Sequence, residues 1–298
     1  MNGNILNNWA TGKLIKNDII FDSPDGIKKA FQDGFFFIEK PHSLSLEAGD
    51  IFASEFYHSK MHKPNDEYRG FKTWTSEKLG KRQGYFIRSN DQVEQFFLEK
   101  AHWENVYPPQ LIVQANQMQQ FGIQIVNTIF SYLNIPSELW DKASGYSLSG
   151  KGSYHLTFNH YRPTIKARGL NTHKDSGWVT VLRSFEPGLE VLINQEWLPV
   201  IPKQNHFIVN FGCAMEILTK HAEYPVSAVV HRVSEQNENR IKDRFSYALF
   251  VDSSLNKQVS DGLYRYSRQQ GLQLETDFEE FLNHIDHSTY EKGSSEFN

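Results

Sequence analysis

The sequence predicts a mainly β protein with flanking helices. Beyond Gly152, short alternating or apolar runs are separated by turn residues, and strands at such regular spacing are typical of an antiparallel sandwich or barrel. Before that point, apolar residues recur at steps of three and four over residues 111–133, which is typical of a long amphipathic helix. A hydrophobic content of 39% with 22 Phe residues provides for a large core.

The amino-terminal elements follow from local signals. A short strand is expected over residues 18–21, and a helix follows that Ser23 caps, Pro24 opens and Gly34 ends. The next expected elements are a strand over residues 34–39, a helix over residues 44–61, and loops and short strands over residues 63–90. Pro136 closes the long helix, since the residue before a proline disfavours helical backbone.

In the second half we expect strands near residues 154–161, 178–183, 189–193, 206–211, 227–233 and 244–251. One helix is expected at about residues 275–284. We therefore expect a single domain over residues 1–298: a mixed α/β part (1–110), the long helix and a linker (111–150), a β core (151–252) and a helical extension (253–298).

Composition narrows the function. Lys plus Arg is 31 and Asp plus Glu is 35, so the net charge of 31 − 35 = −4, without a basic run, gives no reason to expect a nucleic-acid partner. Cys213 is the one cysteine, which rules out an intrachain disulfide and a cysteine-based metal cluster. No secretory signal or membrane-length apolar run is visible. We expect a monomeric cytoplasmic protein with no membrane partner and with a small molecule as its ligand.

Three side chains predict a metal site. His173 and Asp175 stand two positions apart before an apolar run, and alternate residues of an extended chain point to the same side. His231, inside an apolar segment, is the best third ligand. Two histidines and one carboxylate on one face of a metal leave the opposite positions open, as in non-haem iron(II) oxygenases.

A second group of polar residues predicts an anion site. Arg244 and Ser246 share one face of a strand that continues with Ala248 and Phe250, and a buried arginine without a partner is costly. A guanidinium beside a hydroxyl suits a carboxylate. Asn159 and Tyr161 share one face of the strand at residues 154–161.

The chain resembles the isopenicillin N synthase-like iron(II) and 2-oxoglutarate-dependent dioxygenases. The matching motifs keep the order and spacing of that family: Asn159-His160-Tyr161-Arg162-Pro163, His173-Lys174-Asp175-Ser176-Gly177, Gly188-Leu189-Glu190-Val191-Leu192, His231-Arg232-Val233 and Arg244-Phe245-Ser246. The resemblance implies a double-stranded β-helix, or jelly roll, as the core. It also implies iron(II) on His173, Asp175 and His231, with 2-oxoglutarate on Arg244, Ser246, Asn159 and Tyr161, and dioxygen as the oxidant.

The function expected from this resemblance is hydroxylation, desaturation or oxidative ring closure of a small molecule in specialised biosynthesis, with release of succinate and carbon dioxide. Two alternatives stay open: an oxidase that needs no 2-oxoglutarate, of the isopenicillin N synthase or aminocyclopropane carboxylate oxidase type, and a non-catalytic jelly-roll module with structural zinc. Structural zinc normally has four protein ligands, and no fourth is found. By position, the substrate contacts are expected from Tyr85, Arg88, Phe158 and Trp178.

Overall fold

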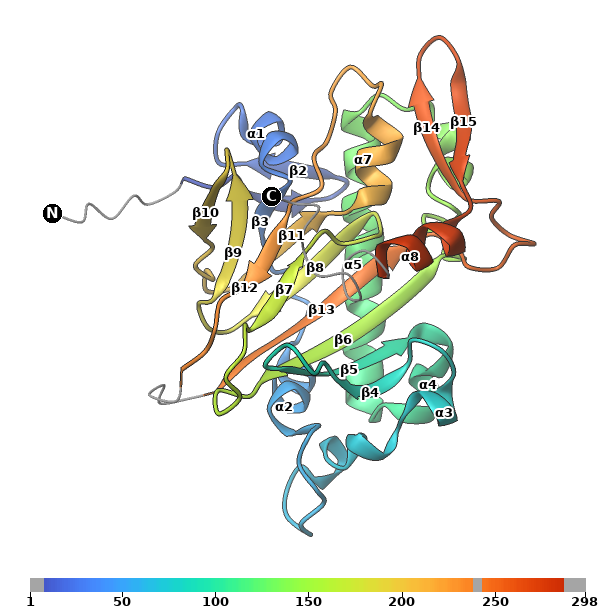
Figure 1. The fold of residues 1–298 in the computed structure, drawn as a ribbon. Coiled ribbons are helices and arrows are strands. Elements are labelled where there is room, and N and C mark those ends of the chain that lie inside the picture. The colour runs from blue at the N-terminus through green and yellow to red at the C-terminus, as the bar shows by residue number, and fades with distance from the viewer. Residues whose placement is uncertain (1–7, 238–242, 287–298) are drawn as a thin grey trace, which may run out of the picture.

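A nine-stranded sheet runs through the computed structural model, which describes residues 8–237 and 243–286 (Figure 1). Its strand order is β2-β1-β3-β11-β8-β13-β6-β5-β4, and all neighbouring pairs are antiparallel except β1 and β3. The strands are β1 (Thr11–Ile15), β2 (Asp18–Phe21), β3 (Phe35–Glu39), β4 (Gly84–Ile87), β5 (Val93–Glu99), β6 (Ser153–Tyr161), β8 (Val179–Ser184), β11 (His206–Phe211) and β13 (Arg244–Asp252).

A four-stranded sheet of order β10-β9-β12-β7 packs on one side of the large sheet (Figure 1). It consists of β7 (Leu170–His173), β9 (Leu189–Ile193), β10 (Glu196–Pro199) and β12 (His231–Val233). Leu189 and Val191 of this sheet form a buried cluster with Phe35, Phe37 and Ile208 of the large sheet. Burial of such apolar surface is the main force that holds the two layers together.

Helix α5 (Pro109–Tyr132) packs against β8 and β13 of the large sheet (Figure 1). Its Gly122 permits this approach, because an added Cβ would lie 2.8 Å from a methyl carbon of Val251. The other helices are α1 (Gly26–Asp33), α2 (Glu47–Glu55), α3 (Ser76–Leu79), α4 (Trp103–Val106), α6 (Trp140–Ala143), α7 (Cys213–Thr219) and α8 (Phe278–Asp286), with 3-10 turns at Asp66–Tyr68, Phe71–Thr73, Lys100–His102 and Ser137–Leu139.

The mainly β architecture with flanking helices and the long helix are confirmed, but three predicted elements need correction. The helix expected over residues 44–61 ends at Glu55, where the chain turns and Phe56 packs near Phe96. The strand expected over residues 227–233 begins only at His231, because the Ser227 N–H donates to the Phe31 carbonyl beyond the sheet.

The extension expected to be helical starts with a hairpin, β14 (Leu263–Ser267) and β15 (Gly271–Thr276), before α8. Residues 287–298 of that extension lie outside the described residues. The boundary predicted at residue 151 does not divide the sheet either. Strands β1 to β5 come from the amino-terminal part, and two of them, β3 and β5, pair with β11 and β6 of the predicted core. Edge pairing of this kind leaves no periodic signal in the sequence.

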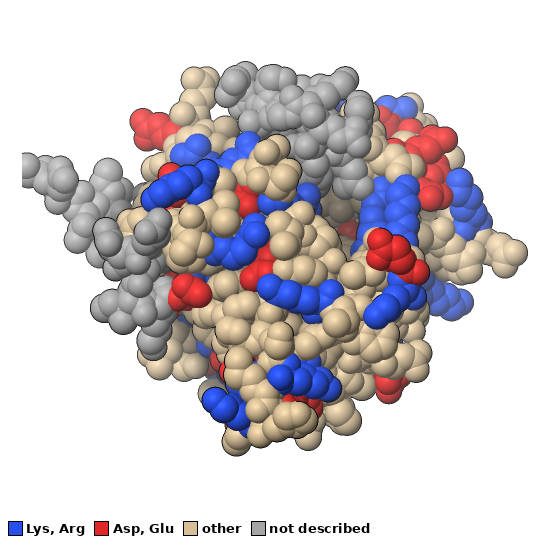
Figure 2. All heavy atoms as spheres, turned by 60° about the horizontal axis from the view of Figure 1, so that its bottom comes forward, with Lys and Arg blue, Asp and Glu red and all other residues tan. Residues whose placement is uncertain are grey.

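On the face seen in Figure 2, Lys and Arg side chains are spread among uncharged areas, and acidic side chains lie beside several of them. Within the described residues, no helix has both the length and the apolar character that crossing a bilayer requires.

Candidate metal and co-substrate site

Strands β7 and β12 bring the two predicted histidine ligands together. His173 ends β7 and His231 begins β12, and they lie directly opposite each other in the ladder. Asp175 follows in the turn between β7 and β8, and its Oδ1 lies 3.7 Å from Nε2 of each histidine. All three side chains are buried. In the described part of the chain, this trio is the one group of three whose ligand atoms all lie within 4.8 Å of one another.

The backbone fixes the tautomer of both imidazoles. His173 Nδ1 lies 2.8 Å from the Asn171 carbonyl oxygen, and His231 Nδ1 lies 3.1 Å from the Val229 carbonyl oxygen. A carbonyl oxygen only accepts, so each Nδ1 carries the proton and each Nε2 presents a lone pair toward Asp175. Hydrogen bonding of the non-ligating nitrogen is the usual support of a metal-bound histidine. The donor set therefore fits a divalent metal.

Electrostatics favour the ligand forms of these groups. Burial and the neighbouring His231 lower the pKa of His173 to about 4, so this imidazole is neutral near pH 7. For Asp175, burial raises the pKa, but the two histidines and hydrogen bonds from Thr180 and Asn210 outweigh it and lower the pKa. Asp175 is therefore a carboxylate and His173 a neutral imidazole before a metal binds, so neither has to release a proton when it does.

Arg244 and Ser246 lie on the face of β13 that points between the two sheets, as alternation predicts. Asn159 of β6 lies directly opposite Ser246 and donates from Nδ2 to its Oγ at 3.2 Å. Tyr161 lies opposite Arg244, whose guanidinium carbon is 4.4 Å from the centre of the Tyr161 ring. The four residues predicted to hold 2-oxoglutarate therefore form one continuous patch.

Arg244 tests whether this patch fits an anion. Its exposure is 1%, and among the described residues it forms no ion pair with a carboxylate. Nη2 donates to Ser184 Oγ at 3.2 Å, whereas Nε and Nη1 are buried without a hydrogen-bond partner. A buried guanidinium with two unsatisfied nitrogens is unfavourable unless an anion binds there. The patch fits the carboxylate of a keto acid.

Two of the predicted substrate residues lie in the core instead. Phe158 is fully buried and packs 4.4 Å from Phe52 of α2, because it alternates with Asn159 and so points to the opposite face of β6. Trp178 is also fully buried, with its ring edge-to-face against Phe130 of α5. Their placement in the substrate pocket is therefore wrong.

The other two predicted substrate residues, Tyr85 and Arg88, lie on opposite faces of the large sheet. Tyr85 lies opposite Phe96 on the helix-covered face, and its hydroxyl donates to Glu94, so this substrate assignment is wrong as well. Arg88 follows β4 on the other face and donates from Nε to Gln95 Oε1 at 2.9 Å. Gln95 Nε2 in turn donates to Asn159 Oδ1 at 2.6 Å, which links Arg88 to the co-substrate patch.

Glu94, on the helix-covered face, gives a prediction about stability. It accepts hydrogen bonds from Tyr85 and His160 and pairs with Lys72 at 3.1 Å. Burial raises its pKa, but these partners outweigh burial and lower it from 4.5 to about 2. A lowered pKa stabilises the fold above the unfolded-state value, and this contribution is lost as the pH falls from about 4.5 to about 2.

We expect Glu94→Gln to reduce the free energy of unfolding at pH 7 by roughly 3 kcal/mol, which is the shift converted at about 1.4 kcal/mol per unit. The loss should shrink at pH 3, where wild type has itself lost part of this contribution. Urea denaturation at both pH values measures it. Glu39→Gln removes a more exposed partner of Lys13 and should change stability less. An equal loss at both pH values would contradict the assigned role.

Three phenylalanines lie beside the site: Phe86 and Phe97, which sequence reasoning missed, and Phe250, which it placed on the face of Arg244 without assigning it a role. Phe86 lies opposite Gln95, Phe97 opposite Thr157 and Phe250 opposite Thr180, so all three share the face of the metal and co-substrate residues. Each is only partly buried, and none belongs to a buried core cluster. Partly exposed apolar side chains on this face are available to contact an apolar substrate. Alternation beyond Arg244 and Ser246 gave the face of Phe250, whereas Phe86 and Phe97 were missed because β4 and β5 were not recognised as paired strands.

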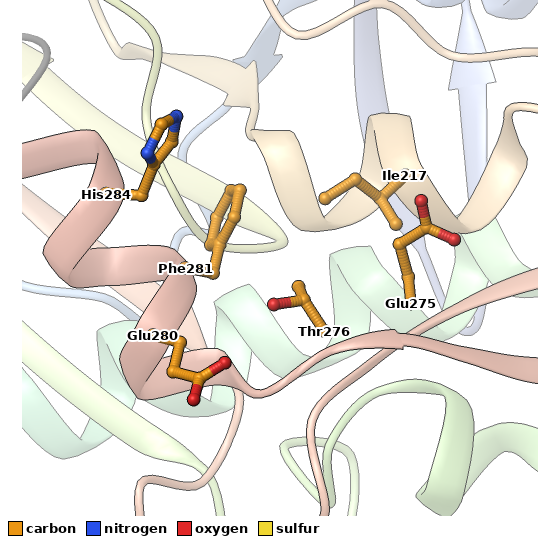
Figure 3. A pocket seen from close by; sticks show the side chains of 6 residues that line it. All are labelled: Ile217, Glu275, Thr276, Glu280, Phe281 and His284. Carbon is orange, nitrogen blue, oxygen red and sulfur yellow. The ribbon is translucent and has the colours of Figure 1, made fainter.

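A pocket of about 420 Å³ lies between α7, the end of β15 and α8 (Figure 3). Ile217 extends into it from α7, and Phe281 and His284 extend from α8. None of the predicted metal, co-substrate or substrate residues lines it.

Comparison with known proteins identifies the family. The model of the 2OG-Fe(II) oxygenase superfamily matches residues 153–253, which include all the predicted metal and co-substrate residues. Thebaine 6-O-demethylase from Papaver somniferum is 32% identical over 258 residues, a match that covers 79% of this chain and 67% of the demethylase. The chain belongs to the 2OG-Fe(II) oxygenase superfamily. The predicted use of iron, 2-oxoglutarate and dioxygen is that of this family.

Other matches define how far the likeness reaches. DMR6-LIKE OXYGENASE 1 from Arabidopsis thaliana is 30% identical over 132 residues, and that match spans 36% of the relative's own length. The crystal structure of JOX2 in complex with 2OG, Fe and JA superimposes with a TM-score of 0.64 and 20% identity, over 87% of this oxygenase and 80% of JOX2. The predicted jelly-roll core is confirmed.

Proposed function

We propose that the protein oxidises a small, largely apolar molecule with iron(II) held by His173, Asp175 and His231 and with 2-oxoglutarate held by Arg244 and Ser246. Hydroxylation, desaturation or oxidative ring closure in specialised biosynthesis would be the outcome. The observation that carries the proposal is the buried guanidinium of Arg244, with Nε and Nη1 lacking partners on the face shared with the metal site. A structural metal module has no need of such an anion site.

The chain's own residues have distinct roles in this proposal. Bound iron(II) and 2-oxoglutarate would supply the activation of dioxygen, with succinate and carbon dioxide released. His173 and His231 present neutral Nε2 atoms, and Thr180 and Asn210 hold the Asp175 carboxylate by hydrogen bonds. Phe86, Phe97 and Phe250 would keep water away from the reacting centre, which limits side reactions.

Formation of labelled succinate from labelled 2-oxoglutarate tests the proposal. The full chain is incubated with iron(II), ascorbate and a panel of apolar natural-product precursors, including a jasmonate and an alkaloid methyl ether, because JOX2 is crystallised with JA and the poppy relative is a demethylase. We expect iron-dependent succinate release that one class of compound stimulates. Absence of succinate with every compound, despite bound iron, would overturn the proposal.

The same experiment separates the two alternatives. Oxidation of a panel compound with no need of 2-oxoglutarate would indicate an oxidase of the isopenicillin N synthase type. Metal analysis that finds zinc held by four protein ligands, without the weak visible band of an iron(II) keto-acid complex under anaerobic conditions, would indicate a structural module.

Arg88 is proposed as a substrate contact. It lies over Phe86, with its guanidinium carbon 5.2 Å from the ring centre, and its charge, after burial and His231, contributes to the lowered pKa of His173. We expect Arg88→Ala to raise the apparent KM by about tenfold for the panel compound that most stimulates succinate release, because a charge-assisted hydrogen bond is lost. The KM for 2-oxoglutarate should stay within about twofold.

Steady-state kinetics measure both constants, and Arg268→Ala, which removes an exposed partner of Glu223, serves as the matched control. Equal constants in wild type and Arg88→Ala would remove Arg88 from the substrate site.

A further inference from the structure

A histidine and an aspartate that the metal site does not use lie on the same face of the large sheet. His155 of β6 lies opposite Phe250 of β13, which in turn lies opposite Thr180 of β8. Thr180 is hydrogen-bonded to Asp175, so His155 stands two strands away from a residue that holds a metal ligand. Strands are about 4.8 Å apart, which places the His155 backbone about 10 Å from that of Thr180. A small molecule can span this distance.

The polar atoms of this pair are not satisfied. His155 is 8% exposed, and its Nδ1 is buried without a hydrogen bond, 3.5 Å from Oδ2 of Asp252. Asp252 is 6% exposed, and its Oδ1 also lacks a hydrogen bond. Buried polar groups without partners are costly, and proteins keep few of them unless a function requires them. An ordinary core would have apolar residues at both positions.

The side chains around His155 are typical of a binding site rather than of a buried core. The Phe97 ring lies 4.5 Å from the imidazole and 6.1 Å from the Phe250 ring, and both phenylalanines are partly exposed. Asp252 is held from behind by the turn that carries Asp175, because a Cβ added to Gly177 would lie 2.1 Å from Asp252 Oδ1. The pair is therefore fixed between the metal-binding turn and the aromatic lining.

The hydrogen-bonding chemistry of His155 and Asp252 indicates which substituent of a substrate they would bind. An ionised carboxylate only accepts, so Asp252 favours the tautomer of His155 that carries its proton on Nδ1. Nε2 is then an acceptor and the nitrogen available to a ligand. We propose that His155, positioned by Asp252, accepts a hydrogen bond from a hydroxyl group on an otherwise apolar, ring-containing substrate. This assignment deepens the proposed function and rests on it, because it places the substrate beside Asp175.

Two fragments that differ in one hydrogen-bond donor test this assignment. Phenol and anisole share a ring and an oxygen atom, but only phenol can donate. Their dissociation constants are measured by ligand-observed NMR on the full chain loaded with Zn(II) and 2-oxoglutarate. We expect phenol to bind about five- to tenfold more tightly than anisole, which is the effect of one buried hydrogen bond. Equal affinities in wild type would overturn the assignment, even where a variant fails to fold.

Variants locate the effect. His155→Phe preserves the ring against Phe97 and should weaken phenol to the level of anisole while anisole is unchanged. His42→Phe alters an imidazole that is 91% exposed and should leave both affinities unchanged. Asp252→Asn, whose amide can donate to Nδ1 and so favour the other tautomer, should reduce the preference for phenol. Discrimination that persists in His155→Phe would overturn the proposal.

A third fragment and a separate titration complete the design. Benzoate binding more tightly than phenol, in a manner that depends on His155, would show an anion site and overturn the hydroxyl assignment. Binding of 2-oxoglutarate and Zn(II) is measured separately in every variant. Lack of discrimination in wild type, with intact 2-oxoglutarate binding, counts against the His155 assignment alone, whereas failure of wild type to bind 2-oxoglutarate counts against the proposed function.

Discussion

Replacing His231 with alanine is expected to abolish tight iron(II) binding and to lower succinate formation at least about 100-fold. His231 Nε2 is one of two imidazole nitrogens that face Asp175 Oδ1 at 3.7 Å, and without it only two protein ligands remain. Two ligands hold a divalent ion weakly against water. Anaerobic calorimetry with iron(II), or with cobalt(II) as an air-stable substitute, measures the binding directly.

His206→Ala provides a matched control for this prediction. His206 has the same local support, with Nδ1 2.7 Å from the carbonyl oxygen two residues earlier, but it lies at the partly exposed start of β11. The control should bind metal as wild type does. Wild-type metal affinity in His231→Ala would place the metal elsewhere and remove the basis of the proposed chemistry.

Replacing Arg244 with leucine is expected to weaken 2-oxoglutarate binding by about 30- to 5000-fold, while metal binding is retained. Removing one partner of a buried charge pair costs about 2–5 kcal/mol, and here the partner is the co-substrate carboxylate. The free energy of unfolding of the cofactor-free variant should fall much less than the free energy of 2-oxoglutarate binding. In that state Arg244 keeps two buried nitrogens without partners, and an apolar replacement relieves this cost.

Calorimetric titration with 2-oxoglutarate and thermal unfolding of the cofactor-free protein measure the two effects. Arg232→Leu is the control: Arg232 pairs with Glu190 at 2.7 Å and stacks on Trp197 at the surface of the small sheet. Unchanged 2-oxoglutarate affinity in Arg244→Leu would favour an oxidase that does not use the keto acid. A large loss of stability with unchanged affinity would assign Arg244 to the fold instead.

Short-range spacing explains why much of the site could be predicted. His173 and Asp175 converge because alternate residues of an extended chain share a side, and Arg244 and Ser246 share a face for the same reason. The mainly β class and helix α5 followed from periodicity. The metal set of three, with the four co-substrate residues, also followed from motifs that keep the order and spacing of a family. The structure brings these residues into two adjacent groups.

The substrate side could not be predicted in the same way. Tyr85, Phe158 and Trp178 were predicted by position alone. Phe158 stands one position from Asn159 on β6 and so points to the opposite face, and Tyr85 and Trp178 pack against Phe96 and Phe130 instead of the site. Phe86 and Phe97 were missed because their role depends on β4 pairing with β5 and on β5 pairing with β6, the latter across more than fifty residues of chain. The short helix α2 and the hairpin β14–β15 likewise depend on contacts outside their own segments.

The sequence by itself determined the donor atoms of this protein: which imidazoles, carboxylate and guanidinium exist, and which of them share a strand face. Only the tertiary structure decided which strand faces lie side by side, and so which apolar side chains share the face of the metal site. The physical reason is that strand alternation is a local property of the backbone, whereas the pairing of strands is set by burial of side chains far apart in the chain. His155 and Asp252 show the difference, because alternation places His155 on the face of Asn159, but only the folded sheet brings it beside Asp252.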